Sequence, residues 1–226
     1  MITLTISPDR PDPQVVGEAV TLLRAGRVLA YATDTLYGLA VDPRREDAVE
    51  RLFVLKGRDE RTPIPLIAAD LAQAQRIGEF GEQELRLAES FWPGPLTIVV
   101  PARPGLAARV LAGGRTIAVR VPAHAVARAL ARVLGSPITA TSANLSGHPA
   151  PASLSQLDPA LLDRIDAVLD SGPAPGGPPS TIVAATDDGF RLLRAGAIAW
   201  DRVLRSATGP ARTERRTEID ERADDG

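Results

Sequence analysis

The stretch "PITATSANLSGHPAP", residues Pro137–Pro151, begins as an apolar strand and continues as a loop of short hydroxyl and amide groups. Ile138 is followed within eight residues by five small polar side chains, and Gly147 comes directly after them. Ser, Asn, Gly and Pro are common turn residues, so a plain turn is one interpretation. The other interpretation is the rim of a pocket that holds a polar ligand. The other segments of the chain are needed to distinguish these two interpretations.

Strands and helices alternate on both sides of this stretch. Asp12-Pro13 predicts an N-capped helix that ends at Gly26, with Val16, Val20 and Leu23 on one face. The alternation predicts an α/β protein with a mixed sheet. The remaining predicted helices cover 45–58, 70–78, 82–91, 124–135 (with Val126, Leu130 and Val133 facing inward) and a short segment near 154–164, and the strands cover 27–32, 64–69, 96–101, 116–122, 166–172, 180–186 and 190–196.

Length and composition are those of a soluble globular protein. The 226 residues are 44% hydrophobic and 24% charged, which suffices for a substantial core. We expect residues 1–206 to form one domain. Residues 207–226 carry four arginines and six acids around a single large aliphatic side chain, so we expect a disordered charged tail there.

Several kinds of chemistry lack support in the sequence. There is no cysteine and there are only two histidines, which argues against disulfides, a Ser-His-Asp triad and a protein-held metal site. No phosphate loop of the GxxxxGK[ST] type, no GxGxxG and no HExxH occurs. The net charge of −2 argues against nucleic-acid binding by charge alone. No run approaches the roughly 20 apolar residues of a membrane span, and we expect a cytoplasmic protein.

Two segments place polar or cationic groups directly after an apolar element. In "YATDTLYGLA" the polar residues Thr33, Asp34 and Thr35 follow a strand, and Gly38 allows close backbone approach, although Asp-Thr at a strand end is more often a simple turn. In "KGRDERTPIPL" Lys56 is the only lysine among the 26 basic residues, and Arg58 follows two positions later. These two cations suit phosphate oxygens, although a basic helix C-terminus that complements the helix dipole is an equally good interpretation.

Further polar groups lie at the ends of later strands. Arg120 interrupts the apolar strand "TIAVRVP", where it either lies along a sheet edge or binds a carboxylate or phosphate. "PPSTIVAA" and "FRLLRAG" add Ser180 and Arg194 near strand ends. Ligands of open α/β sheets tend to bind at strand ends, so we expect these groups to converge.

The combination of these segments resembles a known family. "TDTLYGLA", "KGR", "WPGPLTIVVP", "TIAVRVP", "TATSANLSG", "STIV" and "LLRAGAI" occur in the order seen in the YrdC-like family, over roughly Pro13 to Trp200. The chain resembles the family's short bacterial form, without the extra C-terminal domain of the longer form. The resemblance implies a twisted mixed β-sheet flanked by helices, with a concave ligand-binding face.

The resemblance also implies an activity. Members of the family that the chain resembles are L-threonylcarbamoyladenylate synthases, nucleotidyltransferases that form threonylcarbamoyl-AMP and pyrophosphate from L-threonine, bicarbonate and ATP. A partner transferase complex then moves the threonylcarbamoyl group to tRNA, and a weak contact with tRNA is a further expectation. Mg²⁺ is expected as the cofactor that accompanies ATP, held mainly by phosphate and water.

Matched positions then carry implied roles. The resemblance implies that Arg120 pairs with the carboxylate of threonine. The implied catalytic residues are Lys56, Arg58, Ser142 and Asn144; the implied threonine-binding residues are Thr35, Arg120, Ala140 and Ser180; and the implied nucleotide-binding residues are Lys56, Arg58, Thr62, Thr116, Ser142 and Arg194.

Two alternatives to this activity stay open from the sequence. A YrdC-like domain can bind RNA without catalysis, although the charges of residues 1–206 balance. A related carbamoyl-group enzyme is the second alternative. ATP-dependent pyrophosphate release that requires threonine separates the synthase from both.

Overall fold

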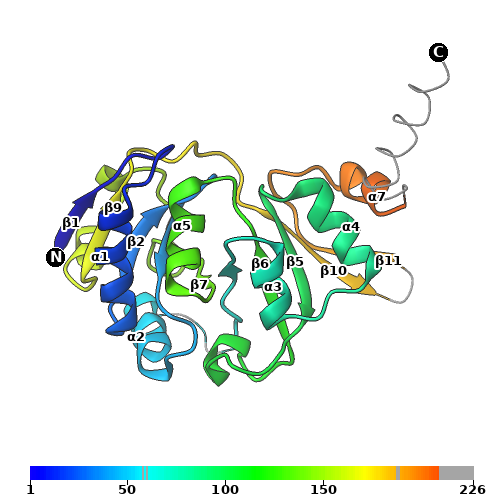
Figure 1. Ribbon diagram of the computed structural model, residues 1–226, viewed down its shortest axis with the longest axis horizontal. Helices are drawn as coiled ribbons and strands as arrows, with labels where there is room; N and C mark the ends of the chain where they lie inside the picture. The colour runs from blue at the N-terminus through cyan, green and yellow to red at the C-terminus, as the bar shows by residue number, and fades with distance from the viewer. Residues whose placement is uncertain (58, 60, 187–188, 209–226) are drawn as a thin grey trace, which may run out of the picture.

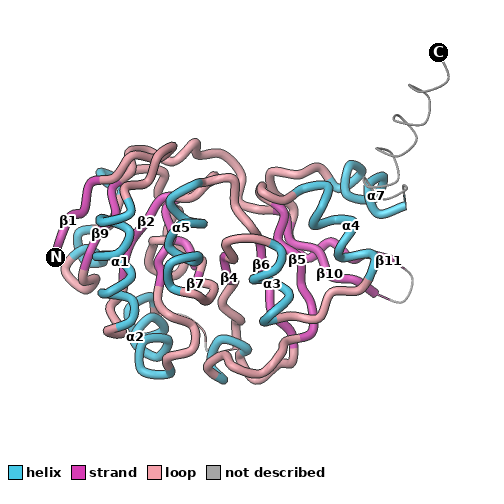
Figure 2. The backbone as a smooth tube through the Cα atoms, in the orientation of Figure 1, coloured by secondary structure: helices cyan, strands magenta, loops and turns pink. Residues whose placement is uncertain are grey.

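The computed structural model describes residues 1–57, 59, 61–186 and 189–208. Within these residues the strands form two mixed sheets, which Figures 1 and 2 show side by side. The first sheet has the order β1-β9-β2-β3-β8, and the second sheet has the order β11-β10-β5-β6-β4-β7. The strands are β1 (Ile2–Thr5), β2 (Leu29–Ala32), β3 (Tyr37–Ala40), β4 (Leu66–Ile67), β5 (Leu96–Pro101), β6 (Thr116–Arg120), β7 (Ile138–Thr139), β8 (Thr141–Ser142), β9 (Ala167–Asp170), β10 (Thr181–Thr186) and β11 (Gly189–Arg194).

The helices begin and end where local chemistry satisfies their free backbone groups. The carboxylate of Asp12 accepts the N–H of Gln14 at 2.8 Å, so α1 starts as predicted. Helix α2 ends at Gly57, whose φ of 57° lies in the left-handed region that favours glycine. The helices are α1 (Pro13–Arg24), α2 (Glu46–Lys56), α3 (Leu71–Ile77), α4 (Glu82–Phe91), η1 (Ala108–Leu111), α5 (Ala125–Leu134), η2 (Leu154–Gln156), α6 (Pro159–Leu162) and α7 (Trp200–Thr208).

Each sheet has its own helical cover. Helices α1 and α5 lie together against the first sheet, and Val16, Val20 and Leu23 are buried as predicted (Figure 1). The prediction that Val133 faces inward is wrong, because Val133 is 44% exposed, whereas the next residue, Leu134, is buried. The buried positions of α5 repeat every four residues, at 126, 130 and 134, which leaves position 133 on the solvent side. Helices α4 and α7 pack together beside the second sheet.

The stretch 137–151 joins the two sheets. Strand β7 pairs with β4 in the second sheet, and β8, one residue further on, pairs with β3 in the first sheet. Thr139 binds across this junction: its hydroxyl donates to the carbonyl of Leu39 and accepts the N–H of Val41, both at 2.9 Å. The hydroxyl of buried Tyr31 donates to the carbonyl of Thr139 at 3.0 Å. These hydrogen bonds fix how the two sheets are joined. The burial of the Tyr31 hydroxyl at this junction also raises the pKa of Tyr31.

The prediction of a mixed α/β fold is confirmed, with the strands divided between two sheets instead of one. Five of the described elements lie where none was predicted: β1, β3, η1, β8 and α7. Helix α7 extends two residues into the predicted tail 207–226, of which residues 209–226 lie outside the described residues. None of the helices that the structure describes has the length and apolarity needed to cross a bilayer.

Candidate active site

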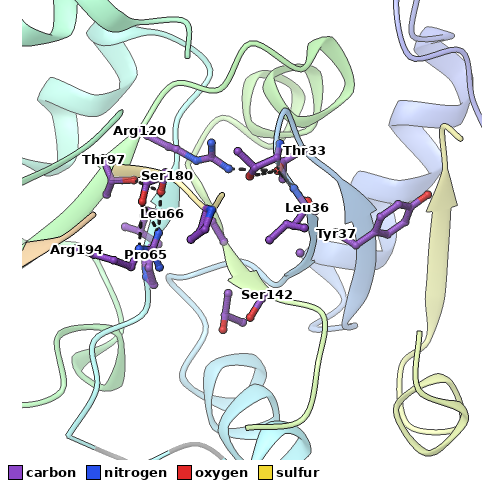
Figure 3. Close-up of a pocket in the computed structure, with 15 residues that line it drawn as sticks. Thr33, Leu36, Tyr37, Pro65, Leu66, Thr97, Arg120, Ser142, Ser180 and Arg194 are labelled. Carbon is purple, nitrogen blue, oxygen red and sulfur yellow. Dashed lines mark hydrogen bonds between the residues drawn. The ribbon is translucent and has the colours of Figure 1, made fainter. Parts of the chain in front are cut away.

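A cavity of about 140 Å³ opens where the two sheets meet (Figure 3). A single water takes up about 30 Å³, so the cavity admits a molecule of several heavy atoms. Pockets for drug-sized ligands measure about 300–1,000 Å³, so a nucleotide would have to lie at the mouth of this cavity. The lining residues are Thr33, Thr35, Leu36, Tyr37, Gly38, Pro65, Leu66, Thr97, Arg120, Ala140, Thr141, Ser142, Pro179, Ser180 and Arg194.

The wall from the first sheet consists of hydroxyl groups held by local hydrogen bonds. The hydroxyl of Thr33 accepts the backbone N–H groups of Thr35 and Leu36 at 3.2 and 3.3 Å and donates to the carbonyl of Leu36 at 2.8 Å. The hydroxyl of Thr35 lies 3.1 Å from that of Thr33. Gly38 supplies the close approach that the sequence predicts, since a Cβ there would lie 3.3 Å from the carbonyl oxygen of Thr141. This wall is neutral and is fixed by its own turn.

The wall from the second sheet carries two arginines, and the first of them is neutralised. Arg120, at the end of β6, donates from Nη1 to the carboxylate of Asp34 at 2.8 Å and from Nη2 to the hydroxyl of Thr33 at 3.3 Å. The side chains of Arg120 and Asp34 are only 8% and 10% exposed. Figure 3 shows the Arg120 side chain pointing toward Thr33. Two of the five N–H donors of Arg120 are used in these bonds, so the others remain for a ligand.

The second arginine, Arg194, has a different environment. It lies at the end of edge strand β11, where Nε and Nη2 donate to the carbonyl of Ser180 at 3.1 and 2.8 Å, and Nη2 also donates to the Ser180 hydroxyl at 2.9 Å. The Ser180 hydroxyl lies 2.8 Å from that of Thr97. Burial, and then the charge of Arg120, lower the pKa of Arg194. Among the ion pairs within the described residues none involves Arg194, so the cavity has a net positive charge.

Lys56 lies behind the cavity and holds the loop after β8. Lys56 is 3% exposed, and its Nζ donates to the carbonyl of Ser142 and, at 2.7 Å, to the carbonyl of Asn144. The backbone N–H of Ser146 returns a bond to the carbonyl of Lys56 at 3.1 Å. The amide of Asn144 donates to the carbonyl of His148 at 2.6 Å. The lysine therefore sets the path of the backbone that presents Ser142 to the cavity.

The structure brings most of the predicted site residues together. Thr62 is exposed in the loop after α2 and does not line the cavity. Thr116 is also exposed, and it lies about 13 Å along β6 from Arg120, at the rise of about 3.3 Å per residue of a strand. Arg58 lies outside the described residues. The predicted residues that line the cavity are Thr35, Arg120, Ala140, Ser142, Ser180 and Arg194, while Lys56 and Asn144 form the support behind Ser142.

Three residues of the site had no role assigned from the sequence, although Thr33 and Asp34 belong to the polar segment predicted to follow a strand. Thr33 and Thr97 line the cavity, and Asp34 neutralises Arg120. Thr97 carries a sequence signal, because it is the polar residue inside the otherwise apolar strand "LTIVVP". Asp34 has no such signal, since an Asp-Thr pair after a strand is an ordinary turn sequence.

These features define an α/β protein with a cationic, hydroxyl-lined cavity at the junction of two sheets, and comparison with known proteins identifies the family. Residues 21–196 match the Sua5/YciO/YrdC family model, which is described as telomere recombination. The chain therefore belongs to the Sua5/YciO/YrdC family.

Individual relatives are similar over most of this chain. The threonylcarbamoyl-AMP synthase of Bacillus subtilis is 38% identical over 206 residues, which are 90% of this chain and 59% of that protein. The threonylcarbamoyl-AMP synthase of Xanthomonas campestris is 40% identical over 166 residues, which are 72% of this chain and 87% of that protein. A crystal structure of Pyrococcus abyssi Sua5 complexed with L-threonine is 32% identical with a TM-score of 0.86, and covers 94% of this chain and 62% of that one. The chain thus spans about three fifths of the Bacillus and Pyrococcus proteins.

Proposed function

We propose that this chain is a threonylcarbamoyl-AMP synthase, which converts L-threonine, bicarbonate and ATP into threonylcarbamoyl-AMP, pyrophosphate and water. The observation that carries the proposal is the small cavity with a net positive charge between Arg120 and Arg194. A cavity of this charge suits an amino acid carboxylate. The relatives named threonylcarbamoyl-AMP synthase and the threonine complex of Pyrococcus Sua5 support the choice of threonine.

In the proposed complex the threonine carboxylate lies between Arg120 and Arg194. Both guanidinium groups keep N–H donors that the described protein contacts do not use. Thr35, Ala140 and Ser180 border the same space and would contact the rest of the amino acid. Leu66 adds apolar surface, which suits the methyl group of threonine.

ATP is proposed to lie at the mouth of the cavity. Ser142 lines that cavity and is presented by the loop that Lys56 and Asn144 hold in place. The family resemblance adds Arg58, Thr62 and Thr116 as candidate nucleotide contacts. Mg²⁺ would come with ATP, held by phosphate oxygens and water, and would neutralise phosphate charge. Asp34, the acid beside the cavity, already accepts bonds from Arg120 and Ala123, and the described residues hold no cluster of three metal-binding side chains.

The proposed reaction needs positioning and electrostatic stabilisation from the protein. The threonine amine forms a C–N bond to the bicarbonate carbon as water leaves, and a carbamate oxygen then bonds to the α-phosphorus of ATP as pyrophosphate leaves. The two arginines would orient threonine, and hydroxyl and backbone donors near Ser142 would face the developing negative charge. No protein nucleophile is required by this scheme.

The product is an activated threonylcarbamoyl group, so a transferase complex that delivers it to tRNA is the proposed downstream partner. ATP and tRNA are solutes of the cytoplasm, and we propose that location for the protein. A direct contact with tRNA remains part of the proposal, to be tested by binding of unmodified tRNA to the purified protein.

The test of the proposed function is pyrophosphate release from ATP, with bicarbonate and Mg²⁺, in the presence and absence of L-threonine. We expect release that requires threonine, and a product with the mass of threonylcarbamoyl-AMP. Release that is independent of threonine, or no release by protein with a cooperative unfolding transition, would overturn the proposal.

A further inference from the structure

Asp34 contacts Arg120, a residue of the cavity wall, but does not itself line the cavity. Its Oδ1 accepts from Nη1 of Arg120 at 2.8 Å, and its Oδ2 accepts the backbone N–H of Ala123 at 3.0 Å. Arg120 ends strand β6, and Ala123 immediately precedes the N-cap of α5. One carboxylate therefore joins three segments: the turn after β2, the end of β6 and the start of α5.

The bond to Asp34 is the strongest restraint on the Arg120 guanidinium. The other hydrogen bond of this group to the described residues is the 3.3 Å bond to the Thr33 hydroxyl, which is longer and involves a neutral acceptor. A charge-assisted bond to a carboxylate is roughly twice as strong as a neutral one. Removing the charge of Asp34 would leave a long, 8% exposed side chain held by one weak bond.

The charges around Asp34 make the position of the Arg120 guanidinium depend more strongly on the Asp34 carboxylate. Arg194 borders the same cavity, and the charge of Arg120 lowers the pKa of Arg194, so the two guanidinium groups repel each other. His124, the N-cap of the adjacent helix α5, also lies within the electrostatic range of Asp34. Asp34 is the acid that neutralises Arg120 among the described ion pairs, so it decides whether the cavity has one uncompensated cation or two.

We propose that Asp34 is a positioning residue, which fixes the Arg120 guanidinium at the cavity wall and cancels its charge, so that one net positive charge faces the single carboxylate of the substrate. This inference rests on the proposed function for the identity of that substrate. Asp34 does not contact the reacting atoms, and its effect passes through Arg120. Its removal therefore affects the use of threonine and leaves the use of ATP unchanged.

The test compares Asp34→Asn with Asp42→Asn in steady-state pyrophosphate release and in calorimetric titration with L-threonine. Asp42 is a matched control, because its side chain is 5% exposed and pairs with Arg44 at 2.7 Å, and neither residue lines the cavity. For Asp34→Asn we expect the KM for threonine to rise about tenfold or more, the size of one lost charge-assisted bond, with kcat and the KM for ATP little changed. Asp34→Glu should recover part of the loss.

The outcomes separate this inference from the proposed function. Threonine-dependent activity in the wild type with an unchanged threonine KM and affinity in Asp34→Asn overturns the role of Asp34 and leaves the function intact. Equal losses in Asp34→Asn and Asp42→Asn also overturn it, because they indicate a general effect on folding. If the wild type shows no response to threonine, the function fails, and a crystal structure of Asp34→Asn decides: an Arg120 guanidinium still at the cavity wall contradicts the positioning role.

Discussion

Arg120 and Arg194 end two strands of the same sheet and border the same cavity, yet their surroundings differ. Arg120 ends the inner strand β6, is almost fully buried and pairs with Asp34. Arg194 ends the edge strand β11 and is held by the carbonyl and hydroxyl of Ser180. A buried cation must be paired for the fold to be stable, whereas a cation at the rim can leave its charge for a ligand. In the proposed complex the first arginine therefore contributes to both the fold and the binding of threonine, and the second contributes mainly to binding.

Arg120→Ala is expected to have the largest effect on stability. The substitution leaves the Asp34 carboxylate buried without its cation, and breaking a buried pair in this way costs about 3–5 kcal/mol. Urea unfolding measures this loss, and pyrophosphate release should show that threonine use is lost as well. An unfolding free energy within about 1 kcal/mol of the wild type, the size of an exposed pair, would place Arg120 in the same class as Arg194.

Lys56→Met tests a third kind of cation, one that is held by backbone carbonyls. The change leaves the carbonyls of Ser142 and Asn144 without this donor, and each unsatisfied buried group costs about 1–3 kcal/mol. We expect lower stability in urea and a loss of pyrophosphate release of at least about tenfold, because the loop that presents Ser142 loosens. Normal release by Lys56→Met would show that this loop has no part in the reaction.

Arg194→Ala is expected to change stability by less than about 1 kcal/mol, because no buried charge loses its partner. It should lower kcat/KM for threonine about tenfold to a hundredfold, the range for one hydrogen bond to a charged group. The matched control is Arg191→Ala, an exposed arginine of the same strand that does not line the cavity. Equal kinetics in the two variants would remove Arg194 from the site.

Tyr37→Phe tests the cavity wall that comes from the first sheet, and we expect it to have the smallest effect on the free energy of unfolding. The Tyr37 hydroxyl donates to the carbonyl of Gly172 at 2.7 Å, which ties the segment between β9 and β10 to the first sheet, and its loss should cost about 0.5–1.5 kcal/mol near pH 8. Burial, and then Asp170, raise the pKa of Tyr37 to about 12.

The pH dependence of this effect follows from the raised pKa. The folded state keeps the proton that the unfolded chain loses near pH 10, so the contribution is complete below pH 10 and is lost as the pH rises to about 12. The stability of the wild type should therefore fall more steeply than that of Tyr37→Phe between pH 10 and 12. Tyr31, the other tyrosine, is present in both proteins and acts as the internal reference. If stability fell with pH equally in the wild type and in Tyr37→Phe, the raised pKa of Tyr37 would be contradicted.

The parts of the fold that could be predicted from sequence are those with local signals. Asp12 and Gly26 mark the two ends of α1 as predicted, Asp12 through its side-chain cap and Gly26 through a φ of 77° that favours glycine. The predicted helix 45–58 extends past Gly57, where α2 ends. The strand β1 could not be predicted in this way, because it is four residues long and pairs with the distant strand β9. The strand β3 pairs with the neighbouring β2 in a hairpin, but it is also only four residues long and its other partner, β8, lies about 100 residues away. The division into two sheets depends on the junction at Thr139, where partners about 100 residues apart bind each other.

The site shows the same division between local and distant signals. Polar groups at strand ends predicted a common pocket, and Thr35, Ser180 and Arg194 do line one cavity. The pairing of Arg120 with Asp34 spans 86 residues, so an arginine inside an apolar strand predicts a carboxylate or phosphate partner without identifying Asp34. Thr116 is not at the cavity, because a strand has two ends and only the Arg120 end of β6 faces the junction.

We propose that the cavity between the two sheets binds threonine through Arg194, a cation for which the described residues provide no acidic partner. Calorimetric titration of L-threonine into the wild type and into Arg194→Ala tests it most directly. We expect one threonine per chain for the wild type and an affinity at least about tenfold lower for the variant. Equal affinity in the two proteins, or no binding to a folded wild type, would contradict it.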